Sequence, residues 1–333
     1  MARLNELYPP AGILDALEGA SGEVRIEAGG RTFFAAVDPA GAAAFKAEYP
    51  EAVIVQGGTD VGVWCNKRFF EPEAVLNISK IPELRKIGVH DGVLEVGGGV
   101  TLETLQAHVK DLVPELWKIL DWFGAPQIRS AGTLAGNIAN GSPIADTLPF
   151  LYVMEAELEL AGPRRGEAVI EDGGLRIEDG GPGAIARRRI SILGFYKGYK
   201  EFDLEPGEFI TRVLIPLPAG DQVLRLHKVS KRQDLDISTF TAGFLMRQRG
   251  EVIDEIRIAY GGVGPVVYRL AKTEAFLTGK PATEEVFREA GAIAREEIAP
   301  ISDVRGTAGY RFTLAERILL RFFHETAGAE VAA

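Results

Sequence analysis

Short apolar runs alternate with glycine-rich turns along most of the chain, which is typical of a protein that mixes strands and helices. In the first third, alternating or short buried runs predict strands, and one stretch of helical spacing predicts a helix over 40–49. The predicted strands lie near residues 24–26, 32–35, 52–55, 74–78 and 93–96. Later strands are predicted at 151–160, 206–217, 223–230, 238–247 and 253–260.

Four further helices are predicted, three of them from capping residues. Thr101 is typical of an N-cap for a helix with Leu102, Leu105, Val109 and Leu112 on one face, and a second helix follows over 114–123. Near the C-terminus, Thr283 caps one helix, and Thr313-x-x-Glu316 has the form of a capping box for the last one. The order of elements predicts an α+β fold, with three antiparallel strands followed by helices in the second part.

Two features divide the chain. Pro216-Leu217-Pro218 is a plausible domain boundary, and 161–186, rich in Gly, Arg and acidic residues, is typical of an exposed hairpin or loop insertion. The basic run Arg187 to Arg189 is interpreted as a solvated surface segment, with a phosphate site as the alternative.

Composition excludes several classes of function. The length of 333 residues suggests two domains at roughly 150 residues each, and the net charge of −10 argues against a duplex-binding surface. The N-terminus lacks the apolar stretch of a signal peptide, and no run approaches the ~18 apolar residues of a membrane span. With Cys65 as its single cysteine, the chain is expected in the reduced cytoplasm. The four histidines, at 90, 108, 227 and 324, have no ligand spacing, and no metal site is predicted.

Two loops of small residues are the main candidates for a binding site. The chain has neither G-x-G-x-x-G after its first strand nor G-x-x-x-x-G-K-[ST], so the Rossmann and P-loop interpretations fail. It has instead a loop over 56–62 (QGGTDVG) and another over 130–138 (SAGTLAGNI). Successive glycines let backbone N–H groups converge on an anion, so two facing loops could clamp a pyrophosphate. Ordinary turns remain the alternative for each loop taken alone.

The same stretches carry a resemblance to a known family. Residues 53–62 (VIVQGGTDVG) and 127–146 (QIRSAGTLAGNIANGSPIAD) resemble the two FAD loops of the flavoprotein (medium) subunit of molybdenum hydroxylases. Further matching segments extend the resemblance over about 24–325, and it is closest to the flavoprotein part of the small subunit of bacterial xanthine dehydrogenase. These segments are 195–199, 206–210, 215–216, 228–234, 236–238, 260–262 and 302–311.

The resemblance implies a specific architecture. It consists of an N-terminal extension over 1–23, an FAD-binding domain over 24–218 and a C-terminal flavoprotein domain over 219–330. The FAD-binding domain would be of the vanillyl-alcohol-oxidase/PCMH type, with two lobes divided near 85–100. The C-terminal domain would be a three-stranded antiparallel sheet with helices.

The resemblance also implies roles for individual residues. Loop residues would hold the FAD pyrophosphate and neighbouring groups, and Asp146 would bind the ribose or adenine side. Phe123 and Ile210 would lie on opposite faces of the isoalloxazine ring, with Lys228 near its polar edge. Lys228, Arg232 and Asp234 would tune the flavin without acid–base or covalent catalysis. The implied loop contacts are Val55, Gln56, Gly57, Gly58, Thr59, Asp60, Val61, Ala131, Thr133, Gly136 and Asn137.

The implied function is electron transfer. Electrons would arrive from [2Fe–2S] clusters on an iron–sulfur subunit, because one cysteine cannot supply the about four thiolates of a cluster. A molybdopterin-binding subunit with the molybdenum cofactor would oxidise the substrate, and NAD⁺ or a similar carrier would be the acceptor. The assembly would be a dimer of heterotrimers. The alternatives are a stand-alone flavin reductase or oxidase of the same fold, and a flavin-free assembly subunit.

Overall fold

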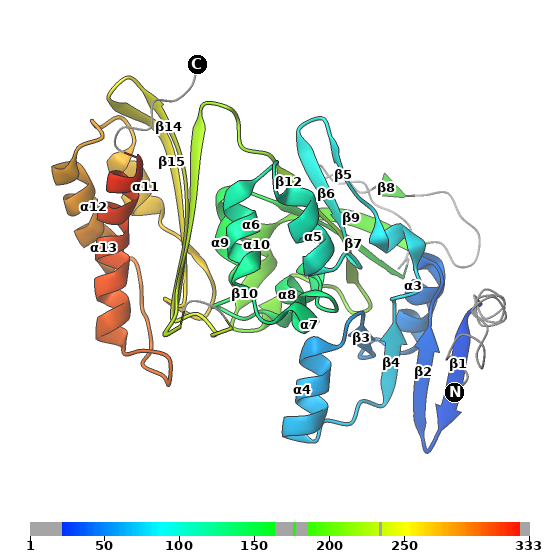
Figure 1. Ribbon diagram of the computed structural model, residues 1–333. Coiled ribbons are helices and arrows are strands. Elements are labelled where there is room, and N and C mark those ends of the chain that lie inside the picture. The colour runs from blue at the N-terminus through cyan, green and yellow to red at the C-terminus, as the bar shows by residue number, and fades with distance from the viewer. Residues whose placement is uncertain (1–21, 164–175, 178–184, 233–234, 327–333) are drawn as a thin grey trace, which may run out of the picture.

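The computed structural model describes residues 22–163, 176–177, 185–232 and 235–326. Three larger β-sheets follow one another in chain order, with helices between and beside them (Figure 1). A two-stranded ribbon of β10 (Tyr196–Gly198) and β11 (Glu201–Phe202) accompanies them. None of the described helices is long and apolar enough to cross a membrane.

The N-terminal sheet has the strand order β1-β2-β4-β3. Strands β1 and β2 are antiparallel, whereas β4 pairs in parallel with both β2 and β3. Parallel neighbours need crossover connections, which α3 and α4 supply. Phe34 of β2 stacks on Phe45 of α3 with ring centroids 5.0 Å apart, and this contact anchors α3 over the sheet. The elements are β1 (Val24–Ala28), β2 (Arg31–Ala35), α3 (Pro39–Glu48), β3 (Val53–Val55), α4 (Thr59–Arg68), β4 (Ala74–Asn77) and the 3₁₀ turn η1 (Pro82–Arg85).

The middle sheet has the order β5-β6-β12-β7-β9-β8 and is antiparallel throughout. Alternate residues of its strands, such as Leu94 and Val96, are fully buried against the helices that follow β6. Its elements are β5 (Ile87–His90), β6 (Val93–Gly97), α5 (Leu102–Val109), α6 (Pro114–Asp121), α7 (Pro126–Arg129), α8 (Leu134–Asn140), α9 (Leu148–Val153), β7 (Glu157–Pro163), β8 (Arg176–Ile177), β9 (Ile185–Ser191), α10 (Ile192–Phe195) and β12 (Phe209–Pro216).

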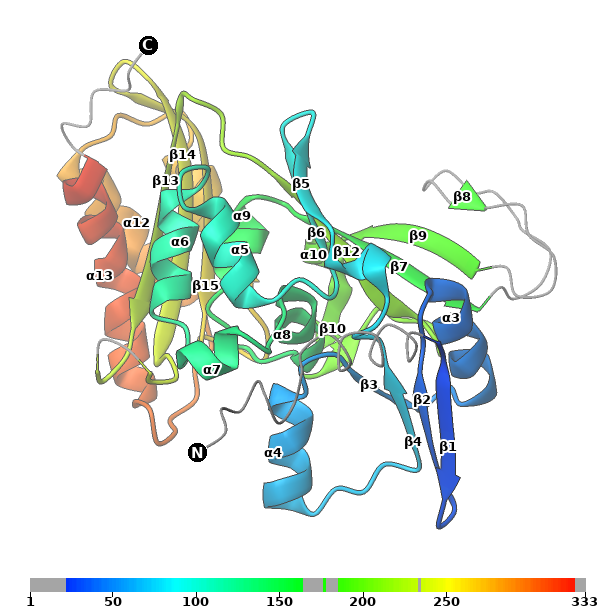
Figure 2. The ribbon, with the colours of Figure 1, turned by 45° about the vertical axis from the view of Figure 1, so that its right-hand side comes forward.

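The C-terminal sheet, order β13-β14-β15-β16, is covered on both faces (Figures 1 and 2). Helices α11 to α13 bury one face, and α9 packs on the other against β14 and β15. Gly243 makes this close contact possible, because a Cβ there would lie 2.8 Å from the Pro149 carbonyl oxygen. The elements are β13 (Gln222–Val229), β14 (Phe240–Arg249), β15 (Val252–Gly261), β16 (Tyr268–Arg269), α11 (Ala271–Leu277), α12 (Glu284–Glu296) and α13 (Ala308–Thr326).

Most strand predictions and the α+β class are confirmed, and the Thr101 and Thr283 caps form as predicted. The Oγ1 of Thr101 accepts from the Thr104 N–H at 3.2 Å, and that of Thr283 accepts from the Val286 N–H at 3.4 Å. The predicted three-stranded sheet gains a short fourth strand, β16. The predicted boundary at 218–219 lies in the connection between β12 and β13, and the domain limits stay a prediction.

Three local predictions are wrong. Helix α13 begins at Ala308, so Thr313 lies inside it and donates to the Gly309 carbonyl instead of capping. The strand predicted over 151–160 is the end of α9 followed by β7, because a fully buried run has no period to separate helix from strand. Helix α5 ends at Val109, which leaves Leu112 exposed.

The basic run is also not simply solvated. Arg187 is 16% exposed and pairs with Glu83 at 2.7 Å and Glu159 at 3.0 Å, and Arg188 pairs with Glu208 at 2.8 Å. Arg189 is exposed as predicted. The acidic partners are distant in sequence, so the run alone could not reveal them. Of the insertion predicted over 161–186, the flanking strands β7 and β9 pair as a hairpin, while most of the residues between them lie outside the described part.

Candidate cofactor-binding site

The first glycine loop leads from strand β3 into helix α4 and touches the second loop directly. A Cβ on Gly57 would lie 1.7 Å from the Ala131 carbonyl oxygen, a distance only glycine allows. Gly58 adopts φ of 69° as the N-cap of α4, and no side chain caps this helix end. The N–H groups of the first turn of α4 therefore remain free of side-chain caps at the positive end of the helix.

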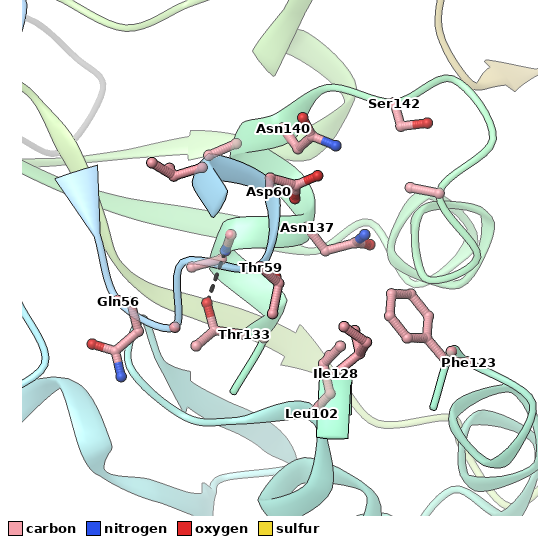
Figure 3. A pocket seen from close by; sticks show the side chains of 18 of the residues that line it. Gln56, Thr59, Asp60, Leu102, Phe123, Ile128, Thr133, Asn137, Asn140 and Ser142 are labelled. Atoms are coloured by element: carbon pink, nitrogen blue, oxygen red, sulfur yellow. Dashed lines mark hydrogen bonds between the residues drawn. The ribbon is translucent and has the colours of Figure 1, made fainter. Parts of the chain in front are cut away.

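The second loop is held by helix α8 and by its contact with α5. Thr133 caps α8, with its Oγ1 accepting from the Gly136 N–H at 3.0 Å (Figure 3). The Leu102 N–H donates to the Gly132 carbonyl at 2.9 Å, which ties this loop to the start of α5. Because Oγ1 of Thr133 uses a lone pair for the cap, its hydroxyl hydrogen stays available to a ligand.

Arg129 fixes the turn that presents Phe123. It is 9% exposed, and its Nη1 donates to the carbonyls of Asp121, Phe123 and Gly124 at 3.2–3.3 Å. These bonds replace helix bonds that the end of α6 leaves open. In Figure 3 the Phe123 ring lies beside Ile128 at one side of the pocket, away from Gln56. The buried Arg129 guanidinium thus positions the Phe123 ring, and no ligand is needed to hold it there.

The two loops and this turn enclose one pocket of about 450 Å³, which is in the usual size range of cofactor sites. Thirteen of the predicted site residues line it, and they come from the glycine loops, from strands β12 and β13, from the turn after α6 and from the loop before α9. They are Gln56, Gly57, Gly58, Thr59, Asp60, Val61, Phe123, Thr133, Gly136, Asn137, Asp146, Ile210 and Lys228.

The remaining predicted site residues stand apart from the pocket wall. Val55 ends strand β3, and Ala131 contributes its carbonyl to the contact with Gly57. Arg232 is not in the wall, and its guanidinium and backbone N–H bind the Asp236 carboxylate. Asp234 lies outside the described residues. The structure therefore leaves the flavin-tuning role of these two charged residues a prediction.

A buried ion pair crosses the pocket wall. Lys228 Nζ lies 2.7 Å from Asp146 Oδ2 and 3.0 Å from the Trp122 carbonyl, and Ser238 donates to Asp146 Oδ1. The side chains of Lys228 and Asp146 are 2% and 8% exposed. Burial raises the pKa of Asp146, and the hydrogen bonds from Lys228 and Ser238 oppose that shift. Lysine and serine thus hold the carboxylate in an apolar wall.

This pair joins two residues to which the resemblance gave separate roles. It assigned Asp146 to the ribose or adenine side of FAD and Lys228 to the flavin's polar edge. The structure brings the two side chains into contact, and both roles stay predictions.

Several wall residues were not predicted. Trp64 and Ile128 come from helices next to the loops, Leu204 precedes β12, and Leu235 and Ile237 come from the loop before β14. No role was predicted for any of them, although Ile128, Ile237 and Ser238 stood in segments that resembled the family. Trp64 and Leu204 lay outside those segments.

The wall also contains a polar atom that requires a donor. Gln56 Nε2 donates to the Gly99 carbonyl at 3.2 Å, whereas its buried Oε1 has no hydrogen-bond partner among the described residues. Asp60, in the first turn of α4, is half-buried, and burial raises the pKa of its carboxyl. Free N–H groups for phosphate, acceptors for hydroxyl or amino groups, and an aromatic face together fit a flavin dinucleotide.

Comparison with known proteins agrees with this fit. Residues 26–171 match the FAD binding domain in molybdopterin dehydrogenase, and residues 225–326 match the CO dehydrogenase flavoprotein C-terminal domain. The xanthine dehydrogenase of Oryza sativa subsp. japonica is 26% identical over 84% of this chain. The chain spans only about a fifth (20%) of that protein's length.

Shorter relatives are matched along nearly their whole length. The carbon monoxide dehydrogenase medium chain of Hydrogenophaga pseudoflava is 28% identical over 81% of this chain and 88% of the relative. A solved structure of that organism's carbon monoxide dehydrogenase has a chain that is 26% identical, with a TM-score of 0.77 over 90% of this chain and 96% of the other. The protein therefore belongs to the family of FAD-binding flavoprotein chains of the molybdopterin dehydrogenases.

Proposed function

We propose that this chain is the electron-transfer subunit of a molybdenum hydroxylase similar to xanthine dehydrogenase, and that it passes electrons from a partner's [2Fe–2S] clusters through FAD to NAD⁺. The observation that carries the proposal is the pocket between two contacting glycine loops, with free helix N–H groups on one side and Phe123 on the other. The match of both parts of the chain to flavoprotein families supports it.

The loops would hold the phosphate end of the cofactor. Gly57, Gly58 and the first turn of α4 offer backbone N–H groups, and the Thr133 hydroxyl faces them from the second loop. Asn137 is partly engaged, since its Oδ1 accepts from Thr147 at 2.7 Å, so its amide N–H groups are the ones left to donate. Asp60 would accept from hydroxyl groups.

The opposite end of the pocket would hold the isoalloxazine ring. Phe123 and Ile210 supply apolar surface, and the Lys228–Asp146 pair supplies charge in the same wall, with Lys228 bound to the carbonyl of Trp122 next to Phe123. When bound, FAD can store two electrons and deliver them as a hydride. The side chains position the ring and exclude water, and none of them needs to act as an acid, base or nucleophile.

The proposed partners follow from the small number of cysteines in this chain. One cysteine among 333 residues cannot bind an iron–sulfur cluster, so we assign the clusters to an iron–sulfur subunit and the molybdenum cofactor to a molybdopterin-binding subunit. A dimer of such heterotrimers in the cytoplasm is the assembly we propose. NAD⁺ as the acceptor is part of the proposal and comes from the resemblance to bacterial xanthine dehydrogenase.

The test begins with the absorption spectrum of the purified chain. We expect flavin bands, release of FAD on denaturation, and co-purification of iron–sulfur and molybdenum subunits. No flavin bands would favour an assembly subunit, and full substrate turnover by the chain alone would favour a stand-alone flavoenzyme.

The acceptor needs its own measurement. Anaerobic mixing of the holoenzyme with NADH should bleach the flavin bands, because hydride transfer is reversible, and NAD⁺ should reoxidise the substrate-reduced enzyme faster than O₂. A flavin that NADH does not reduce would refute NAD⁺ as acceptor without touching the FAD assignment.

A further inference from the structure

A second cavity of about 640 Å³ lies at the free edge of the C-terminal sheet. It is bounded by edge strand β13, by α6 on one side of the sheet and by α13 on the other. Figure 1 shows the two helices on opposite sides of this sheet. Lys228 and Trp122 line it and stand next to the flavin pocket, but the cavity shares none of the glycine-loop residues. It is therefore a separate space with its own chemistry.

The charges in its wall do not cancel. Three of its four cations have a carboxylate partner at 2.7 Å: Lys118 with Glu115, Arg321 with Glu325, and Lys228 with Asp146.

The fourth cation is Arg225. Its Nη1 donates to the Leu224 carbonyl at 2.9 Å, and no carboxylate lies within ion-pair distance of it in the part of the chain that the structure describes. The wall thus carries one excess positive charge on a group with several N–H donors left over.

A buried histidine points to the same ligand. His227 is two residues from Arg225 on β13, so both side chains lie on one face of the strand. Its side chain is 4% exposed, and its buried Nε2 has no hydrogen-bond partner among the described residues. The nearest carboxylate oxygen, Glu325 Oε2, is 3.6 Å away, too far for a hydrogen bond.

The histidine is neutral at physiological pH. Burial is the main cause that lowers its pKa to about 4; Arg321 and Arg225 lower it further, whereas Glu325 and Glu115 oppose the shift. A neutral imidazole with its proton on Nε2 is a hydrogen-bond donor. A buried donor without a partner costs about 1–3 kcal/mol, which an oxygen ligand would recover.

We propose that this cavity binds a small oxyanion, a carboxylate or a phosphate, with the Arg225 guanidinium and the Nε2–H of His227 as its two donors. The cavity is large enough for an organic anion, because ligand sites usually measure about 300–1000 Å³. The proposal does not depend on the cofactor, since the donors lie outside the flavin pocket.

The test is calorimetric titration of the full-length protein, with its flavin as isolated, against inorganic phosphate and separately against sodium acetate and sodium benzoate. Ionic strength is held constant with sodium chloride. We expect saturable binding of at least one of these anions at neutral pH. Preference for phosphate or for carboxylates identifies the chemical source of the natural ligand.

Variants distinguish the site from general charge attraction. Arg225→Gln should weaken binding about tenfold or more, and His227→Phe should weaken it while leaving Arg225 in place. Arg249→Gln is the matched control, because Arg249 is on neighbouring strand β14 but is 77% exposed and pairs with Asp254. Circular dichroism and urea midpoints check that each variant folds. No saturable binding by the wild type, or equal affinity in Arg225→Gln and wild type, would overturn the proposal.

Discussion

Replacing Gly57 with alanine tests whether contact between the two glycine loops builds the FAD site. The added Cβ would lie 1.7 Å from the Ala131 carbonyl oxygen, where real Cβ atoms essentially never come within 3.0 Å. The loops must therefore separate by about 1.3 Å, the difference between these two distances. The obstacle is backbone, so no side chain can rotate away. Such overpacking costs about 1–3 kcal/mol, which corresponds to a roughly 5- to 150-fold weaker FAD affinity if the loops must close around the ligand.

FAD affinity is measured on deflavinated protein reloaded with FAD, from the rise in flavin fluorescence when FAD is released. The stability of the apoprotein is measured separately by urea unfolding. Gly62→Ala is the control, because a Cβ at this helical position of α4 meets nothing within 4 Å. We expect Gly62→Ala to bind FAD normally and to be stabilised by about 0.4–1 kcal/mol. If Gly57→Ala kept wild-type FAD affinity and stability, the loops would not act as a clamp.

Three further predictions concern buried polar side chains. Lys228→Met strands the Asp146 carboxylate and should cost about 3–5 kcal/mol in urea unfolding. Because burial raises the pKa of Asp146, the loss should be larger near pH 8 than near pH 5, and an equal loss at both would contradict this explanation. The wild type should lose stability as pH falls from 6.5 towards about 4, since the folded-state pKa of His227 is depressed, and this loss should be smaller in His227→Phe. Parallel pH profiles of the two proteins would disprove this prediction. Arg311→Met removes a 2%-exposed guanidinium bound to Thr239 and Ile301 carbonyls, and a melting temperature equal to the wild type's would show that these bonds are dispensable.

Local chemistry explains which parts of the fold could be predicted. Thr101 and Thr283 cap helices through bonds to residues three positions away, so the signal lies in a short window. Thr313 has the same local signal, but α13 begins earlier, at Ala308, where Thr307 Oγ1 accepts from the Tyr310 N–H at 3.1 Å. Arg311, inside the first part of the helix, binds the Asp303 carboxylate and the carbonyls of Ile301 and Thr239. An earlier threonine therefore caps this helix, and a capping pattern alone does not say which of two threonines begins it.

The site residues also divide into those that the sequence could predict and those that it could not. The glycine loops were predictable because close approach demands glycine at fixed positions, as Gly57 shows. The apolar wall was not, because Trp64, Ile128 and Leu204 reach the pocket only through the packing of separate elements. The Asp146–Lys228 contact joins residues 82 positions apart. Each residue was predicted as a separate contact, and only the structure shows that they share one charge balance.

That contact also determines how the two family-matched parts depend on each other. Asp146 belongs to the part over 26–171, and its partners Lys228 and Ser238 belong to the part over 225–326. Neither part alone can bury this carboxylate, because an unpaired buried charge costs several kcal/mol. The pairing also lowers the net charge that Lys228 presents to the pocket. The resemblance alone would treat Lys228 as a full positive charge, whereas in the structure it is one end of the Lys228–Asp146 dipole. The position of β13 therefore sets both the stability of the pocket wall and the electrostatic potential at the cofactor.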